Sequence, residues 1–271
     1  MEDVQNLHTH TKYDDGADTP EEIILTAVQK GFTSIGFSGH SYMHYAPEHS
    51  MSEEGTEEYK KDIQLLKQKY QNKIEIFCGL EFDMYSEIDL TGYDYLIGAV
   101  HYLLCGDKFV GFDRSAEVVK GVIDDYFAGS GIEYAKAYYK ALSELPRYGD
   151  FDIIGHFDLI TKHADNIKFF DETSREYKNA AIEAAEALSG KIPFFEVNTG
   201  AIARGYRKKP YPSAFLLKEL KRLGFGAVIA SDCHDRNMLD CGFAEAVNLL
   251  KNSGFKERYI LTKQGFVPLS L

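Results

Sequence analysis

The chain carries near its start the stretch Leu7-His8-Thr9-His10-Thr11, followed by Asp14-Asp15-Gly16. His8 and His10 are two residues apart, so in a β-strand both imidazoles point to the same face. Two imidazoles at this spacing, with a carboxylate a few residues on and a glycine to turn the chain, suit a first-row divalent metal ion. The alternative is a pair of surface histidines close to the terminus, and the rest of the sequence has to decide between the two.

Apolar runs typical of buried strands alternate with helical patterns along the chain. After the first run, strands are expected at 34–39, 74–80, 93–100, 151–155, 194–198 and 226–230. Helices are expected at about 20–30, 53–70, 115–145 (two helices broken near 129–131), 172–188, 212–223 and 243–252. Strands that alternate with helices imply parallel pairing through right-handed crossovers, and seven such units most naturally close into a barrel.

We therefore predict an α/β fold, a TIM-like barrel that forms a single domain over residues 1–271, since no linker or repeat interrupts the alternation. A doubly wound open sheet is the rival fold. No G-x-G-x-x-G pattern or P-loop follows the first strand, which removes the usual reason to choose the open sheet.

The composition narrows the class of partner. A net charge of −12 argues against a nucleic-acid surface, because phosphate backbones require basic patches. No apolar run reaches the roughly 18 residues of a membrane span, and the acidic start Met1-Glu2-Asp3 does not resemble a signal peptide. Four cysteines without C-x-x-C spacing are typical of reduced thiols. We expect a cytoplasmic protein with a small-molecule partner; the oligomeric state stays open.

Side chains able to bind metal follow six of the seven predicted strands. These residues are His8 and His10, His40, Glu81, His101, His156, and Asp232 with His234. In a parallel barrel the carboxyl ends of all strands meet at one mouth, where the active site lies. Taken singly, His156 is explained as a core histidine and Glu81 as an ordinary acid at a strand end. Together, the six strand ends predict one metal centre.

This arrangement resembles the polymerase-and-histidinol-phosphatase (PHP) superfamily over nearly the whole chain. The matching pieces are His8-Thr9-His10, Asp15-Gly16, His40, Gly79-Leu80-Glu81, Ala99-Val100-His101, Gly155-His156-Phe157-Asp158 and Ser231-Asp232-Cys233-His234. The resemblance implies a distorted (β/α)7 barrel that holds three clustered divalent metal ions, usually Zn, Fe or Mn.

The resemblance also implies three sets of ligands. His8, His10, Glu81 and Asp232 would hold one ion; Glu81 would bridge to a second, completed by His101 and His156; Asp15, His40 and His234 would hold the third. Many members of the superfamily have a histidine where Asp15 stands. Spacing alone leaves Asp14 and Asp15 both open as the ligand, and the glycine that follows favours Asp15.

Local sequences at 155–162, 196–201 and 211–213 resemble the histidinol-phosphate phosphatase branch. This branch implies a phosphomonoesterase that hydrolyses L-histidinol phosphate by attack of a metal-bridging hydroxide on phosphorus. Glu81, Asp232 and His234 would be catalytic, and Asp232 or His234 would assist the leaving group. The alternatives are another phosphoesterase of the superfamily, namely a nucleotide or oligonucleotide 3′-hydrolase or a protein-tyrosine phosphatase, and a non-catalytic metal-binding barrel.

Basic residues near the predicted mouth suggest how phosphate is bound. Arg204 and Arg207 follow the sixth strand, and either can bind phosphate through two parallel hydrogen bonds. Lys162 is a third candidate. The alternative for this stretch is a solvated basic loop. We expect the partner to be a small phosphate monoester.

Overall fold

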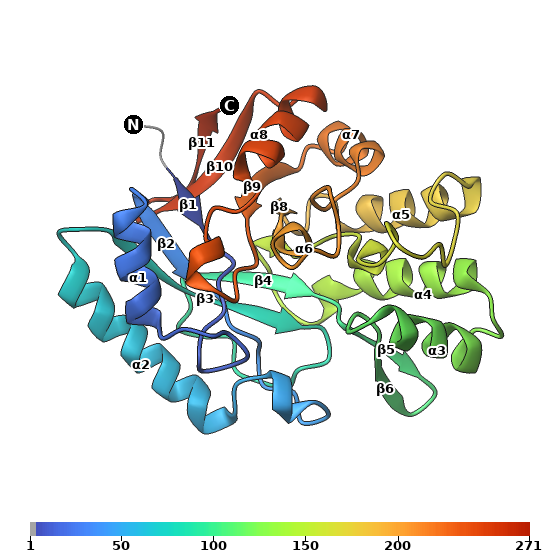
Figure 1. The fold of residues 1–271 in the computed structure, drawn as a ribbon, viewed down its shortest axis with the longest axis horizontal. Helices are drawn as coiled ribbons and strands as arrows, with labels where there is room; N and C mark the ends of the chain where they lie inside the picture. Colours follow the sequence, from blue (N-terminus) through green and yellow to red (C-terminus); the bar gives the residue numbers. More distant parts are fainter. Residues whose placement is uncertain (1–3) are drawn as a thin grey trace.

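The computed structural model describes residues 4–271, in which seven parallel strands form one sheet. In sheet order the strands are β1 (Gln5–Asn6), β2 (Ser34–Phe37), β3 (Glu75–Asp83), β4 (Tyr95–Ala99), β7 (Ile153–Ile154), β8 (Phe194–Asn198) and β9 (Gly226–Ala230). Each strand pairs in parallel with the next one in this order, so chain order and sheet order coincide. This is the order of a barrel, and the sheet curls accordingly (Figure 1).

The two edges of the sheet meet through the segments that follow β1 and β9. Thr9 and Cys233 form a parallel bridge, in which the backbone N–H of His10 donates to the carbonyl of Cys233 at 2.8 Å. The Asn6 side chain adds a hydrogen bond from Nδ2 to Ser231 Oγ at 2.7 Å. The predicted α/β barrel is confirmed as a nearly closed one, and the doubly wound alternative is wrong.

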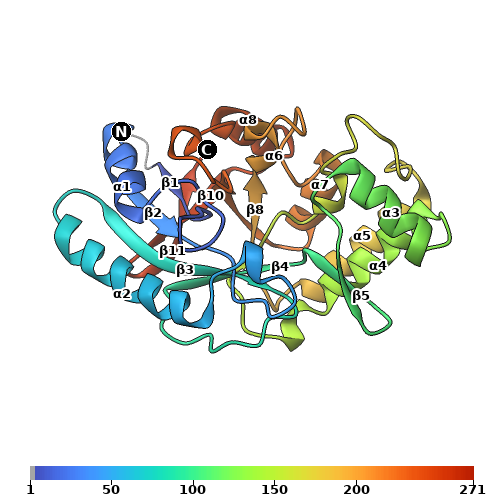
Figure 2. The ribbon, with the colours of Figure 1, turned by 60° about the horizontal axis from the view of Figure 1, so that its bottom comes forward.

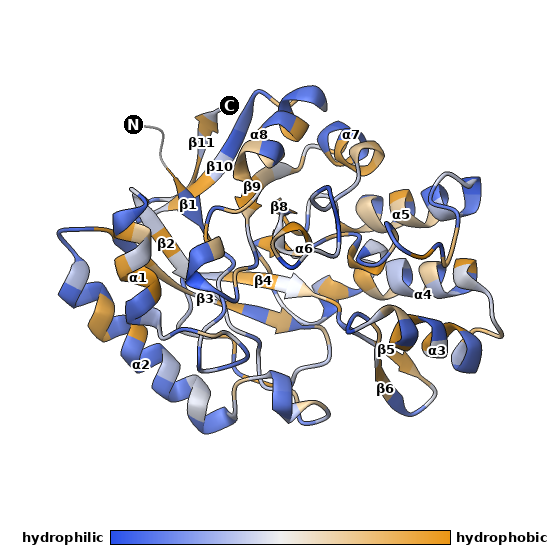
Figure 3. Ribbon diagram, viewed as in Figure 1, coloured by the Kyte–Doolittle hydropathy of each residue, from blue (hydrophilic) through white to orange (hydrophobic). Residues whose placement is uncertain are grey.

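Apart from one short helix at the mouth of the barrel, the helices lie outside the strands (Figure 1). They are α1 (Pro20–Gln29), α2 (Glu53–Tyr70), α3 (Ala116–Tyr126), α4 (Gly131–Ser143), α5 (Arg175–Leu188), α6 (Gly200–Ala203), α7 (Ala214–Arg222) and α8 (Phe243–Asn252). Figure 2 shows the strands from a second direction, with α1 and α2 beside β1–β3 and α3–α5 beyond β4. Most of the helices show both apolar and polar residues, whereas β4 and β9 are largely apolar (Figure 3). Thr19 caps α1 in a capping box with Glu22. Within residues 4–271 we find no helix with the length and apolar character needed to span a bilayer.

Tyr95 fills the space between several strands. Its ring lies against Gly36 and Gly79, where a Cβ atom would overlap the phenol. Its hydroxyl is within hydrogen-bonding distance of the carbonyls of Leu7 and Phe37. The two glycines are therefore required by close packing, and the tyrosine ties the segment before His8 to the neighbouring strands.

The structure differs from the predicted elements at the first strand, at 151–155 and at two hairpins. The first strand and β7 comprise only two residues each. The His8–His10 segment lies beyond β1, yet Thr9 O accepts a hydrogen bond from Ser38 N at 3.0 Å, so the segment is still held on both sides. Neither β5 (Tyr102–Cys105) with β6 (Lys108–Gly111) nor β10 (Glu257–Thr262) with β11 (Gly265–Ser270) is predicted from the sequence.

The C-terminal hairpin β10–β11 covers the amino-terminal end of the barrel. The carboxamide of Gln5 pairs with the backbone of Leu261 through two hydrogen bonds of 2.8 Å. Phe194, the first residue of β8, packs with ring centroids 4.3 Å from Phe266 and 5.0 Å from Tyr259. This end of the barrel is thus filled with apolar side chains, and the opposite end is left for the polar residues.

Candidate metal centre

Glu81 lies at the centre of the histidines that follow the strands. It sits within β3 and is 1% exposed. Its Oε2 lies 2.8 Å from His40 Nδ1 and 3.3 Å from His8 Nε2, and its Oε1 lies 2.9 Å from His156 Nε2. His101 Nε2 completes the ring at 3.6 Å from Oε1. His10 Nε2 also lies 3.6 Å from Oε2. One carboxylate thus faces five imidazoles, which the sequence places as far apart as residues 8 and 156.

Asp232 brings a second carboxylate to His8 and His10. Its Oδ1 lies 3.2 Å from His10 Nε2 and 3.8 Å from His8 Nε2. The backbone of Asp232 is left-handed, with φ at 47°, an unfavourable conformation for a residue with a side chain. Gly200 leaves room for it, since a Cβ atom there would be 2.9 Å from the Asp232 Cβ. The strained backbone of Asp232, in the turn after β9, directs this carboxylate toward His8 and His10.

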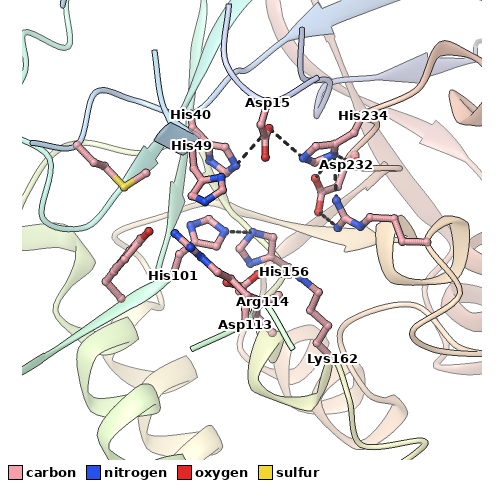
Figure 4. A pocket seen from close by; sticks show the side chains of 14 residues that line it. Asp15, His40, His49, His101, Asp113, Arg114, His156, Lys162, Asp232 and His234 are labelled. Atoms are coloured by element: carbon pink, nitrogen blue, oxygen red, sulfur yellow. Dashed lines mark hydrogen bonds and ion pairs between the residues drawn. The ribbon is translucent and has the colours of Figure 1, made fainter. Parts of the chain in front are cut away.

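Asp15 lies between His40 and His234 (Figure 4). Its Oδ1 is 3.2 Å from His234 Nε2 and 3.9 Å from His40 Nε2. Asp14 is occupied differently, because its Oδ2 accepts hydrogen bonds from His10 Nδ1 at 2.6 Å and from the His40 backbone at 3.1 Å. Of the two aspartates that the sequence leaves open, the geometry favours Asp15 as the one that faces the cluster.

The donor atoms at this centre fit divalent cations. Within residues 4–271, four buried atoms that face one another make no hydrogen bond of regular geometry, although two of them lie as close as 2.8 Å. These atoms are His8 Nε2, His10 Nε2, His40 Nδ1 and Glu81 Oε2. Buried polar atoms without partners are rare and costly, and nitrogen and carboxylate oxygen are the ligands that zinc and iron take. Three groups have ligand atoms mutually within 4.8 Å: His10 with Asp15, His40 and His234; His8 with His10 and Asp232; and His40 with Glu81 and His101.

Three further carboxylates orient the histidines, and sequence reasoning missed this role for all of them. Glu196 accepts from His8 Nδ1 at 2.8 Å, Asp14 accepts from His10 Nδ1 at 2.6 Å, and Asp83 lies 3.2 Å from His101 Nδ1. A carboxylate on the far nitrogen of a histidine is the usual support of a metal ligand. The only signal in the sequence is that Asp83 is two residues after Glu81, on the same face of one strand.

The carboxylates control the protonation of the histidines when no cation is bound. Burial lowers the pKa of His10, but the adjacent Asp14 outweighs it and raises that pKa to about 10. Burial also lowers the pKa of His101, but the nearby carboxylates of Glu81 and Asp83 outweigh it and raise that pKa to about 9. The pKa of Glu81 is held well below its usual value, since the surrounding imidazoles overcome its burial. In the metal-free protein, protons on these histidines therefore balance the negative charge of the carboxylates, which bound cations would otherwise balance.

A cavity of about 360 Å³ opens onto this centre. Besides six of the nine predicted ligands, it is lined by Met43, His49, Tyr102, Asp113, Arg114, Leu159, Lys162 and Arg204. Arg204 lies 3.0 Å from Asp232 Oδ2 through Nη2 and 3.0 Å from His234 Nδ1 through Nη1. Lys162 Nζ is 2.8 Å from Asp113 Oδ2. Arg204 and Lys162 therefore line the cavity, and so does Arg114, which the sequence did not single out.

Arg207 is placed elsewhere, so its predicted contact with phosphate is not supported by the structure. It is absent from the residues that line this cavity in the described part of the chain. Its guanidinium lies 5.2 Å from the ring centre of Tyr211 and donates a hydrogen bond to Thr161. Its charge also acts on the buried carboxylate of Asp158. The turn that follows α6 separates the two arginines, and only Arg204, at its start, meets the centre.

Comparison with known proteins identifies the family. The PHP domain model matches residues 6–200. A probable histidinol-phosphatase of Deinococcus radiodurans is 28% identical over 270 residues, covering 94% of this chain and 95% of the relative. The histidinol-phosphatase of Bacillus subtilis is 26% identical over 261 residues, covering 88% of this chain and 95% of the relative.

A solved structure supports the fold. Histidinol phosphate phosphatase from Lactococcus lactis, complexed with zinc, L-histidinol and phosphate, superposes with a TM-score of 0.74. The two chains are 22% identical, and the match covers 98% of this chain and 100% of the other. The predicted resemblance is confirmed: this chain belongs to the PHP domain family, in the branch that contains these histidinol-phosphatases.

Proposed function

We propose that this protein is a metal-dependent phosphomonoesterase that hydrolyses L-histidinol phosphate to L-histidinol and phosphate. The observation that carries the proposal is the convergence, at the mouth of the barrel, of buried nitrogen and oxygen atoms that make no regular hydrogen bond. The relatives from D. radiodurans and B. subtilis bear histidinol-phosphatase names, and the L. lactis relative was solved with zinc, L-histidinol and phosphate. These supply the substrate and the metal for the proposal.

The proposed centre holds three divalent ions, zinc, iron or manganese. The ligand sets are those implied by the resemblance: His8, His10, Glu81 and Asp232; Glu81, His101 and His156; and Asp15, His40 and His234. The short contacts of Glu81 to both His8 and His156 support its bridging role. His10 lies beside the third set as well, with Nδ1 3.6 Å from Asp15 Oδ1.

Divalent ions held there would lower the pKa of a bound water toward about 7 and neutralise charge on phosphate oxygens. The protein itself supplies the remaining polar contacts. Arg204 has further guanidinium hydrogens beyond those facing Asp232 and His234, and Lys162 has ammonium hydrogens beyond the one facing Asp113. We assign these hydrogens to the phosphate oxygens of the substrate.

The leaving alkoxide needs a proton, which the attacking water gives up, and the proposal assigns the relay of that proton to the pair Asp232 and His234. Their side chains lie 3.6 Å apart, from His234 Nδ1 to Asp232 Oδ1, beside the guanidinium of Arg204. Glu81 completes the catalytic set through its central position.

Met43, Tyr102 and Leu159 form apolar walls of the cavity, against which a flat ring such as imidazole can pack.

The test combines metal analysis with a panel of phosphates. Protein freed of metal is reloaded with zinc, manganese or iron(II), its metal content is measured, and phosphate release is followed. The panel contains histidinol phosphate, p-nitrophenyl phosphate, a phosphotyrosine peptide and a short oligonucleotide. We expect about three ions per chain and a preference of at least about 100-fold in kcat/KM for histidinol phosphate over the aryl phosphate.

The outcomes separate the parts of the proposal. If only the aryl phosphate is hydrolysed, the protein is still a phosphatase, but histidinol phosphate is not its substrate. Preference for the peptide or the oligonucleotide assigns the protein to another activity of the superfamily. Failure of metal-loaded protein to release phosphate from any member of the panel overturns the enzyme itself. Glu81→Gln is the inactive control, because it removes one negative charge from the centre of the ligand cluster.

A further inference from the structure

A hydrogen-bonded chain leads from the metal centre to an aromatic cluster outside it. The hydroxyl of Tyr45 donates to Asp83 Oδ1 at 2.7 Å. The other oxygen, Asp83 Oδ2, accepts from the backbone N–H of His101 at 3.1 Å and lies 3.2 Å from His101 Nδ1. His101 Nε2 in turn faces His156 Nε2 at 3.2 Å and Glu81 Oε1 at 3.6 Å. Tyr45 is thus separated from a predicted metal ligand by one carboxylate.

Tyr45 is itself held by two rings of the β5–β6 hairpin. Its ring stacks on Phe109 with centroids 4.2 Å apart, and it meets the edge of Tyr102 at 5.0 Å. Tyr102 lines the cavity and follows His101 directly in the sequence. Burial and the nearby Asp83 carboxylate raise the pKa of the Tyr45 hydroxyl, so it keeps its proton and remains a donor.

We propose that Tyr45 is a positioning residue that fixes His101 for metal binding through Asp83. This inference rests on the proposed function, since it requires a metal ion at His101. Asp83 is 1% exposed. Among residues 4–271, its Oδ1 has in addition to Tyr45 only a 3.4 Å hydrogen bond from the backbone of Tyr85. Without the Tyr45 hydroxyl, Oδ1 loses its strong donor, and the carboxylate is free to rotate away from His101.

The arrangement also links the cavity wall to the metal centre. Strand β6 ends at Gly111 and leads directly to Asp113 and Arg114, which line the cavity. Phe109 of the same strand packs on Tyr45. A substrate that contacts this wall therefore meets a part of the chain that is packed against the support of His101.

The test compares two tyrosines of one aromatic cluster. Tyr45→Phe keeps the ring and removes the hydroxyl that binds Asp83. Tyr85→Phe is the matched control, since the Tyr85 ring lies 5.2 Å from the same Phe109 while its hydroxyl interacts with the backbone of Leu104. Asp83→Asn serves as a second variant that acts on the same histidine.

Metal-free proteins are dialysed against graded concentrations of zinc or manganese, and the ions bound per chain are counted. We expect Tyr45→Phe and Asp83→Asn to lower the affinity for one ion by about 10- to 100-fold and to leave the affinity for the other ions unchanged. Saturating metal should restore the activity of Tyr45→Phe. Tyr85→Phe should bind every ion with wild-type affinity, which separates positioning of His101 from general loosening of the aromatic cluster.

Binding of every ion by Tyr45→Phe with wild-type affinity overturns the inference, as does equal weakening of all ions in both tyrosine variants. A His101→Ala protein tests the foundation separately. If His101→Ala retains the full number of ions at wild-type affinity, His101 is not a ligand, and that ligand set of the proposed function fails together with the inference. If His101→Ala loses one ion and Tyr45→Phe does not, the inference about Tyr45 fails and the proposed ligand set stands.

Discussion

A buried histidine in this centre has two nitrogen atoms with different surroundings. At His8, Nδ1 faces Glu196 and Nε2 faces Glu81 and Asp232, and the side chain is fully buried. The hydrogen bond to Glu196 places the proton on Nδ1, so the lone pair of Nε2 is directed toward the centre. The carboxylates that orient the imidazoles therefore matter as much as the imidazoles themselves.

Glu196→Gln should weaken metal binding by about 10- to 100-fold, as expected for loss of an orienting carboxylate. The two oxygens of Glu196 accept from His8 Nδ1, from the His156 backbone at 2.7 Å and from Asn198 Nδ2 at 2.7 Å. The glutamine amide places an NH2 donor where one carboxylate oxygen stood, so at least one of these three hydrogen bonds is lost. Metal content after dialysis against a chelator measures the effect, with the exposed Glu186→Gln as control. Equal retention of metal by the two variants would contradict the role of Glu196.

The two arginines should respond differently to truncation. Arg204→Ala should lower kcat/KM by about 100-fold, since a hydrogen bond to a charged group contributes roughly 1.5–3 kcal/mol. Arg207→Ala should leave kcat/KM close to wild type at low temperature and instead lower the melting temperature, because Asp158 is fully buried beside it. Steady-state kinetics and thermal unfolding of both variants decide the matter. A loss of kcat/KM in Arg207→Ala equal to that in Arg204→Ala would restore Arg207 to the site.

At the scale of the element, strand β3 organises the centre. It extends from Glu75 to Asp83, longer than its neighbours, and it contributes both the central carboxylate and the support of His101. The same strand carries Gly79, which makes room for the ring of Tyr95 from β4. The packing of the barrel interior and the placement of Glu81 thus depend on residues two positions apart in one strand.

Gly79→Ala should destabilise the protein by about 3 kcal/mol, because a methyl group there overlaps the Tyr95 ring in a tightly packed interior. Gly121→Ala is a suitable control, since Gly121 lies inside helix α3 with open space around it. That control should be neutral or stabilise by about 0.5–1 kcal/mol. Urea unfolding at constant metal concentration measures both. Equal stability of the two variants would show that Tyr95 can move aside.

At the scale of the molecule, barrel closure is what creates the centre. The ligand candidates run from residue 8 to residue 234 and come from segments that follow almost every strand. Carboxylates are packed there at high density in a protein that is already acidic overall, with a net charge of −12. Asp14, Asp83 and Glu196 add to Asp15, Glu81 and Asp232, so bound cations would be largely neutralised by the protein. The phosphate would then rely on direct contact with the ions and on Arg204, Lys162 and Arg114.

Metal-free protein should lose stability as pH rises from about 6.5 to 10. The pKa of His10 is raised to about 10 and that of His101 to about 9, above the value of 6.5 that an unfolded histidine has. A raised pKa contributes stability that is complete below pH 6.5 and is lost as pH passes the folded value. Melting temperatures measured with a chelator across this range test the expectation. Asp14→Asn should flatten the dependence, and a metal-free melting temperature that rises over the same range would contradict it.

The sequence by itself determined the kind of elements, their order and the chemical nature of the centre. Helix α2 at Glu53–Tyr70 and strands β8 and β9 lie where their local patterns predict them. Ligand-type residues such as Glu81 and His156 could be found because they follow apolar runs, and strand ends converge in any parallel barrel. These features depend on neighbours within a few residues.

Only the tertiary structure decided which of these side chains face the centre. The choice of Asp15 over Asp14, of Arg204 over Arg207, and the support given by Glu196 all depend on the direction of a side chain relative to residues far away in the sequence. The two hairpins are likewise specified by partners such as Gln5 and Tyr45. Local propensity carries no information about such distant contacts, because their energies exist only after the barrel has closed.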